Sequence, residues 1–183
     1  MAKLLYSATM SLDGFIAGPG GDMSWLTEHL GGPNPTADRL LAQIGALLVG
    51  NRTFGGDDPN RGTAKEGAFG GRYEGPVVVL THRPPPRPVP GVTFAGDLKS
   101  AVAEARAAAG DRYVNVLGAN VARQCIEAGL LDELLVFVAP VLLGDGVPLF
   151  ENPGGTRVRL EPLADDPAHW YRVARRGSAG GER

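Results

Sequence analysis

Six short apolar runs are the feature that most constrains the fold of this 183-residue chain. They are rich in Val, Leu and Ile, and several show almost no alternation with polar residues, which is typical of strands covered on both faces. A sheet built from such strands needs a covering layer on each side. The runs are LLYSATM (4–10), ALLVG (46–50), VVVLT (77–81), VTFA (92–95), YVNVLG (113–118) and LLVFVAPVLL (134–143).

Three segments between these runs have helical character. They span residues 36–46, 97–110 and 120–129. Asp97 and Asn120 are suited to the N-cap positions of the last two helices, and a glycine ends each of these two segments. Strands that alternate with helices predict an α/β fold with a mostly parallel central sheet and helices on both faces.

The end of the chain has a different pattern. Residues 157–163 and 169–176 alternate polar and apolar side chains without a helix between them, which predicts an antiparallel hairpin at the sheet edge. Neither an internal repeat nor a second domain is indicated. We therefore expect one domain over 1–176 and a flexible tail over 177–183.

Composition excludes several classes of function. The formal charge of −2 and the 7% aromatic content give no basis for a basic nucleic-acid surface or for binding an anionic membrane. The single cysteine, Cys125, excludes a disulfide framework and a multi-cysteine zinc site, so no metal is expected. The first residues are too polar for a signal peptide or a spanning helix, which predicts a cytoplasmic protein.

Polar residues follow three of the apolar runs directly. In an open α/β sheet, ligands bind at the carboxyl ends of the strands, and hydroxyls, cations and helix N-terminal amides suit phosphate groups. The sequence therefore indicates a ligand with several phosphates, although each of these three strand ends, taken alone, is also compatible with an ordinary turn. The residues concerned are Asn51, Arg52 and Thr53; Thr81, His82 and Arg83; and Gly118, Ala119 and Asn120.

A hydrolase is poorly supported by the sequence. There is no G-x-S-x-G motif, and the three histidines have no evident partners. His82 follows a strand and could help to hold a phosphate, whereas His29 and His169 are expected to be surface or packing residues.

Several motifs in order resemble the dihydrofolate reductase superfamily, and most closely the reductase domain of bacterial riboflavin biosynthesis. They are SLDGFIAGPGGDMSWL (11–26), LLVGNRTF (47–54), VVVLTHR (77–83), VNVLGAN (114–120) and LLDELLVFVAPVLLGDGVPLF (130–150). The resemblance implies a three-layer fold and hydride transfer from NADPH to a pyrimidine- or pteridine-like heterocycle. It also implies a homodimer, for which the apolar 134–143 strand would suit the interface, although that strand is equally compatible with an intramolecular core.

The resemblance also assigns the cofactor contacts. Trp25 falls where the family places a tryptophan near the cofactor, although a plain core aromatic is an equal alternative. The other positions are Gly50, Asn51, Arg52 and Thr53; Thr81, His82 and Arg83 near the adenosine end; and Gly118, Ala119, Asn120, Val121 and Ala122 at the pyrophosphate.

Two carboxylates are candidates for catalysis. The family pattern of Thr, three residues and Asp-Asp-Pro is present from Thr53 to Pro59, which places Asp57 near the nicotinamide as a proton donor. An Asx turn before Pro59 is the alternative. Asp13 is the second candidate, and fixing a turn through backbone amides is at least as good an interpretation for it.

Four positions depart from the family. The second glycine of the pyrophosphate turn is Ala119, and the positions of the usual polar substrate contacts hold Leu30, Leu41 and Leu117. This predicts an NADPH-dependent reductase whose substrate is unassigned and of lower polarity. Two alternatives stay open: 5-amino-6-(5-phosphoribosylamino)uracil reductase of riboflavin biosynthesis, and a non-catalytic nucleotide- or flavin-binding protein.

Overall fold

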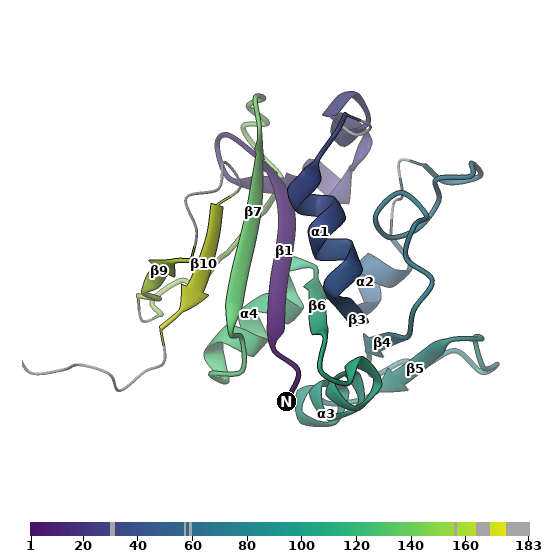
Figure 1. The fold of residues 1–183 in the computed structure, drawn as a ribbon. Coiled ribbons are helices and arrows are strands. Elements are labelled where there is room, and N and C mark those ends of the chain that lie inside the picture. Colours follow the sequence, from purple (N-terminus) through teal and green to yellow (C-terminus); the bar gives the residue numbers. More distant parts are fainter. Residues whose placement is uncertain (30–31, 57, 59, 156, 164–168, 175–183) are drawn as a thin grey trace, which may run out of the picture.

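One eight-stranded sheet organises the protein (Figure 1). The computed structural model describes residues 1–183 except 30–31, 57, 59, 156, 164–168 and 175–183. The strand order is β5-β4-β3-β6-β1-β7-β10-β9. The strands are β1 (Leu4–Ser11), β3 (Ile44–Gly50), β4 (Val77–Leu80), β5 (Val92–Ala95), β6 (Tyr113–Leu117), β7 (Glu133–Ala139), β9 (Leu160–Pro162) and β10 (His169–Val173).

The sheet is parallel from β5 to β7 and antiparallel at β10 and β9. The predicted strands and the predicted edge hairpin are thus confirmed. The remaining pieces are a small sheet of β2 (Phe15–Ala17) and β8 (Val147–Pro148), the 3-10 helices η1 (Pro19–Gly21) and η2 (Ser24–His29), and the helices α1 (Pro35–Gln43), α2 (Asn51–Phe54), α3 (Leu98–Ala109) and α4 (Ala119–Glu127).

Helices cover both faces of the sheet, as the apolar runs require. On one face, α3 and α4 bury Ala101, Ala105 and Cys125 in a core that also contains Leu4 and Val116. On the other face, α1 packs Leu40 against the second core, which includes residues of β1, β3, β4 and β7. Figure 1 shows α1 and α4 on opposite sides of the sheet, in line with these two clusters.

Two predicted boundaries were wrong, for identifiable reasons. The predicted 36–46 helix ends at Gln43, because Ile44 is extended and already pairs with β6. The predicted 134–143 strand ends at Ala139, because Pro140 has no amide hydrogen for the ladder. Leu135 of β7 is buried in the second core, Phe137 packs against that core, and Leu134 packs against the first core, so these side chains serve the intramolecular core.

Helix caps follow the sequence in one case and not in the other. The Asp97 side chain accepts a hydrogen bond from the Ser100 amide, 2.9 Å away, and caps α3 as predicted. The predicted N-cap at Asn120 is wrong: the N-cap of α4 is Gly118, two residues earlier, and no side chain caps the helix. The Asn120 amide oxygen instead accepts from Gln124 Nε2, at 2.7 Å.

A carboxylate is buried at the start of β7, away from the carboxyl ends of the strands. Glu133 is 3% exposed, and its oxygens lie 2.8 Å from Lys3 Nζ, 3.0 Å from the Tyr113 hydroxyl and 2.9 Å from Trp170 Nε1. Burial, followed by the charge of Glu133, raises the pKa of Tyr113 to about 12. The tyrosine therefore stays protonated and donates to the carboxylate.

Asn115 in the middle of β6 is buried, and neither polar atom of its side chain has a hydrogen-bond partner among the described residues. It pairs in register with Leu5 and Leu47, so its side-chain amide is surrounded by apolar groups. We expect Asn115→Val to raise the free energy of unfolding by about 1 kcal/mol, because an unpaired buried amide is costly. Urea denaturation of both proteins measures this, and a lower midpoint for the variant would contradict it.

Candidate ligand cleft

A large open cleft lies at the carboxyl ends of the parallel strands. It encloses about 2670 Å³, well above the roughly 300–1,000 Å³ of an ordinary small-molecule pocket. Its lining includes residues at or just after the ends of β3, β4, β5, β6 and β7. The volume is sufficient for a dinucleotide and a second ligand.

The N-terminus of α4 forms one wall of the cleft. Gly118 has φ +97°, and a Cβ on it would overlap Thr53 Oγ1 of α2. A Cβ on Gly50 would come within 3.0 Å of Val121 Cγ2, so the ends of β3 and β6 both approach their neighbours closely. The first amides of the nine-residue α4 have no intrahelical acceptor and no side-chain cap, which makes this wall attractive to an anion.

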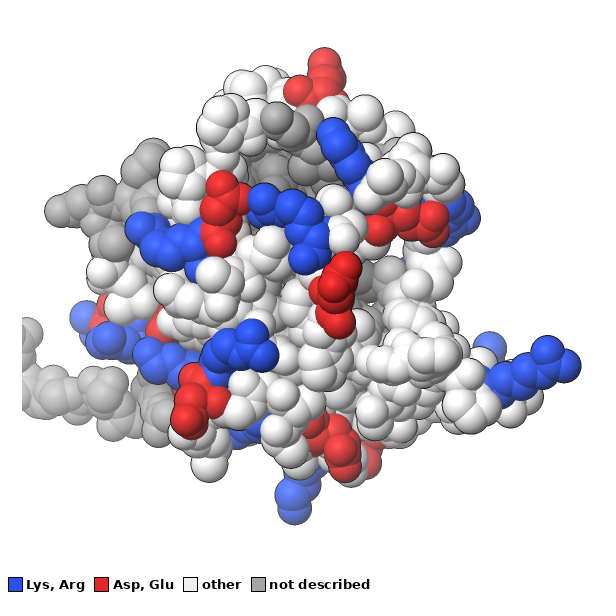
Figure 2. Space-filling view, turned by 45° about the vertical axis from the view of Figure 1, so that its right-hand side comes forward, with Lys and Arg blue, Asp and Glu red and all other residues white. Residues whose placement is uncertain are grey.

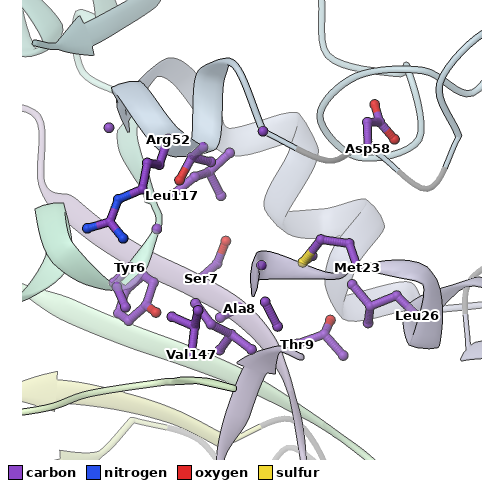
Figure 3. A pocket seen from close by; sticks show the side chains of 18 of the residues that line it. Tyr6, Ser7, Ala8, Thr9, Met23, Leu26, Arg52, Asp58, Leu117 and Val147 are labelled. Atoms are coloured by element: carbon purple, nitrogen blue, oxygen red, sulfur yellow. The ribbon is translucent and has the colours of Figure 1, made fainter. Parts of the chain in front are cut away.

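Cationic and hydroxyl groups line the same side of the cleft. Thr81 is buried at the end of β4, and its Oγ1 accepts a hydrogen bond of 3.1 Å from the Arg83 amide. The side chains of Arg52, His82 and Arg83 are exposed and have no ion pair with any described residue. In Figure 3 the guanidinium of Arg52 reaches from α2 into the open space.

The cleft therefore brings together most of the expected cofactor residues. Those in its lining are Gly50, Asn51, Arg52, Thr53, Thr81, His82, Arg83, Gly118, Ala119, Asn120 and Val121. Ala122 does not line it, because this residue is fully buried in the core beneath α4.

Trp25 is not among the described residues that line the cleft either. It is partly buried on η2, with its Nε1 buried and unpaired, and its ring centroid lies 6.2 Å from that of His29. Its neighbours Met23, Leu26 and His29 do line the cleft. The placement favours a packing role for Trp25 and gives His29 a position that the sequence did not indicate.

Asp13 fixes a turn instead of facing the cleft. Its Oδ1 accepts from Ser11 Oγ at 2.6 Å and from the Leu143 amide at 3.1 Å, and its Oδ2 accepts from the Gly144 amide at 2.7 Å. The Ser11 hydrogen bond, followed by that of the Leu143 amide, lowers the pKa of Asp13. A carboxyl group that is readily ionised and already bonded to amides is a poor proton donor, which favours the turn interpretation.

The acidic pair lies in the loop after α2. Asp57 is outside the described residues, whereas Asp58 lines the cleft. The carboxylate of Asp58 accepts from the Asn60 amide at 2.8 Å and from the Gly67 amide at 2.6 Å. Asp58 therefore shapes this loop. Farther along the loop, Arg72 binds Asp38 of α1, with both guanidinium nitrogens 2.8 Å from Oδ1.

Residues of β1 line the cleft floor, which the sequence did not predict. Ser7 and Thr9 of β1 lie near Leu117 of β6 and Phe137 of β7, and Thr9 pairs in register with Phe137. Figure 3 shows Ser7, Ala8 and Thr9 along this strand. The sequence pattern that could have predicted them is the two-residue spacing of Ser7 and Thr9, which puts both hydroxyls on one face of a strand.

The three leucines that replace family polar residues do not share one site. Leu117 lines the cleft, as the departure from the family suggested. Leu41 is partly buried on α1, one turn beyond the residues of this helix that reach the cleft. It is therefore not one of the described residues that line the cleft. Leu30 lies outside the described residues.

On the face seen in Figure 2, the described basic and acidic side chains are interspersed and form no continuous basic area. Among the described residues, no three His, Cys, Asp or Glu residues are grouped as a metal site. Within the same part of the chain, no helix is both long enough and apolar enough to cross a membrane.

Fold and cleft together define an α/β ligand-binding domain with an anion-attracting helix terminus at the carboxyl edge of a parallel sheet. The chain belongs to the RibD C-terminal domain family, whose model matches residues 2–171. This confirms the resemblance to the dihydrofolate reductase superfamily.

Individual relatives support the same family. The chain is 30% identical to the riboflavin biosynthesis protein RibD of Haemophilus influenzae over 84% of its own length but only 51% of that protein, so it spans about half of this relative. It is 28% identical to the uncharacterized protein YwjB of Bacillus subtilis, over 86% of this chain and 88% of the other. The fold matches a putative riboflavin biosynthesis protein from Shewanella sp. PV-4 with a TM-score of 0.71 and 24% identity, over 96% of this chain and 100% of that one.

Proposed function

We propose that this protein is an NADPH-dependent reductase of a heterocyclic small molecule. The observation that carries the proposal is the coincidence of three phosphate-suited strand ends in one cleft. Family membership adds support, because the RibD relative acts in riboflavin biosynthesis. The alternative reaction, reduction of 5-amino-6-(5-phosphoribosylamino)uracil, is a narrower form of the same proposal.

The lining residues fit a dinucleotide phosphate. Gly118, which leaves open the space that a Cβ would fill, and the amides that follow it would hold the pyrophosphate. Arg52 and Arg83 are the guanidinium groups that would bind further phosphate oxygens, including a 2′-phosphate. When bound, NADPH supplies the hydride. The chain's own residues hold the two ligands next to each other.

A proton must accompany the hydride when a ring C=N is reduced. We assign this step to the carboxyl group of Asp57, on the basis of the family motif and of the neighbouring Asp58, which lines the cleft. Asp13 has no part in the proposed step, because its carboxylate is bound to a hydroxyl and two amides. The homodimer remains a prediction from the family resemblance.

Titration with NADPH and NADH tests the cofactor assignment. We expect NADPH to bind more tightly, and we expect Arg52→Ala or Arg83→Ala to reduce that preference by about tenfold or more, because each removes a charge-assisted contact. Arg87→Ala is the control, since Arg87 is exposed and outside the described lining. Failure of both nucleotides to bind at millimolar concentration would refute the proposal, and an unchanged preference in both variants would refute the arginine assignments.

Oxidation of NADPH in the presence of pterins, pyrimidine precursors, flavins and quinones separates an enzyme from a binding protein. Turnover of any of these compounds supports the reductase. Tight NADPH binding without turnover of any of them would favour a non-catalytic nucleotide-binding protein of the same fold.

A further inference from the structure

The floor of the cleft on the α1 side differs from the α4 wall. Here the floor compartment is formed by the apolar side chains of Ala8, Met23, Leu26, Leu117 and Phe137, with the hydroxyls of Ser7 and Thr9 among them. We infer that this compartment binds an uncharged, planar fused-ring heterocycle and that the Ser7 hydroxyl orients it by a hydrogen bond. The inference rests on the proposed function, because it describes the partner of the nicotinamide ring.

Ser7 has an unusual hydroxyl. The residue is 6% exposed, yet its Oγ has no hydrogen-bond partner among the described residues. The Oγ atom is not fully buried, since it is not one of the completely buried polar atoms without a partner. Figure 3 shows it pointing into the space that Leu117 and Met23 frame in this view. Since nearly all buried polar groups are hydrogen-bonded, this hydroxyl is suited to a ligand that enters the cleft.

The surrounding side chains set the shape of the compartment. Leu117 and Phe137 are partly buried on the strands that flank β1. Met23, just before η2, and Leu26 of η2 approach from the other side (Figure 3). Broad apolar side chains with a few hydroxyls between them favour a flat ring that is oriented by a small number of hydrogen bonds.

Charge on this side argues against a phosphorylated ligand. Arg72 lines the cleft, but both of its terminal nitrogens bind Asp38. Lys65, the other described basic residue of this loop in the lining, is exposed. The free guanidinium groups of Arg52 and Arg83 follow β3 and β4, where the proposed cofactor would use them. Among the described lining residues, this side of the cleft thus offers Lys65 and His29 as basic groups, but no arginine that is free for the bidentate binding of a phosphate.

A comparison of lumichrome, riboflavin and FMN separates recognition of the fused ring from recognition of a phosphate group. Calorimetric titration uses the whole protein saturated with NADP⁺, which prevents turnover. We expect lumichrome to bind and FMN to bind no more tightly than riboflavin. An affinity for FMN more than tenfold above that for riboflavin would overturn the inference, as would absence of lumichrome binding. Failure of NADP⁺ itself to bind would overturn the proposed function instead.

The Ser7→Ala variant tests the hydroxyl. We expect it to weaken lumichrome binding about three- to tenfold, the value of one neutral hydrogen bond, and Ser7→Thr to retain most of the affinity. Thr93→Ala removes an exposed hydroxyl of β5 outside the described lining and is the binding control. Unchanged lumichrome affinity in Ser7→Ala would overturn the role of Ser7.

A stability comparison shows whether the Ser7 hydroxyl has a structural role. Ser11, on the same strand, is fully buried, donates to Asp13 and accepts from the Phe15 amide. Ser11→Ala should therefore lower the melting temperature, whereas Ser7→Ala should leave it nearly unchanged. A similar loss in both variants would show that the Ser7 hydroxyl serves the fold and would contradict the inference.

Discussion

Replacing Gly118 with alanine is expected to reduce the affinity for NADPH at least tenfold and to destabilise the protein by about 1–3 kcal/mol. The residue has φ +97°, which an L side chain rarely adopts, and the added Cβ would overlap Thr53 Oγ1. The Thr53 side chain would then have to change its rotamer, or the ends of β6 and α2 would have to move apart. Because both segments line the anion-attracting wall, the variant should lose binding as well as stability. Nucleotide titration and thermal unfolding measure the two effects.

Gly129→Ala is the matched control for this variant. Gly129 follows the other end of α4 with φ +67°, and a Cβ on it would meet no atom within 4 Å. The Gly129→Ala substitution should lower the free energy of unfolding by about 1 kcal/mol, because of the backbone conformation alone. It should leave the affinity for NADPH unchanged. Equal losses of affinity in both variants would mean that Gly118 acts only through global stability, and the proposed pyrophosphate wall would be wrong.

The Glu133→Ala variant should lose about 3–5 kcal/mol of unfolding free energy. Glu133 is buried and accepts hydrogen bonds from Lys3, Tyr113 and Trp170. Its removal leaves the tyrosine hydroxyl and the indole N–H without an acceptor and creates a cavity. Urea denaturation monitored by tryptophan fluorescence would measure the loss, and Trp170 lies within the network.

Glu161→Ala provides the comparison, because this carboxylate forms a largely exposed pair with Arg172 at 3.9 Å. Exposed pairs are worth about 0–1 kcal/mol, so the variant should be close to the wild type. Since Glu133 lies at the amino end of β7, far along the strand from the cleft, we expect Glu133→Ala to retain its NADPH affinity at temperatures where it is folded. Loss of affinity in the folded variant would contradict this separation of core and site.

The sheet could be predicted because strand and helix signals are local. Unbroken Val and Leu runs report burial on both faces, and Asp97 reports a helix start through a contact only three residues away. The N-terminus of α4 was misassigned by the same local reasoning. Asn120 is a good cap by residue type, but Gly118, with its positive φ, is the N-cap, two residues earlier.

The candidate site was only partly accessible from the sequence. Residues that directly follow strands could be assigned, because parallel strands end at one edge and place Arg52, Thr81 and Gly118 in one cleft. Side chains within strands could not be assigned in this way. Whether Ser7 faces the cleft or the core depends on the packing of η2 and α1 above that face of β1.

The sequence by itself determined the α/β class, the edge hairpin and the phosphate-suited strand ends, because each follows from periodicity or from neighbours along the chain. Only the tertiary structure decided that Asp13 holds a turn, that Trp25 and Ala122 are not among the residues that line the cleft, and that Ser7 Oγ has no hydrogen-bond partner in the part of the chain that the structure describes. The physical reason is that these outcomes depend on contacts between distant segments. Asp13 binds amides 130 and 131 residues away, and local spacing carries no information about such contacts.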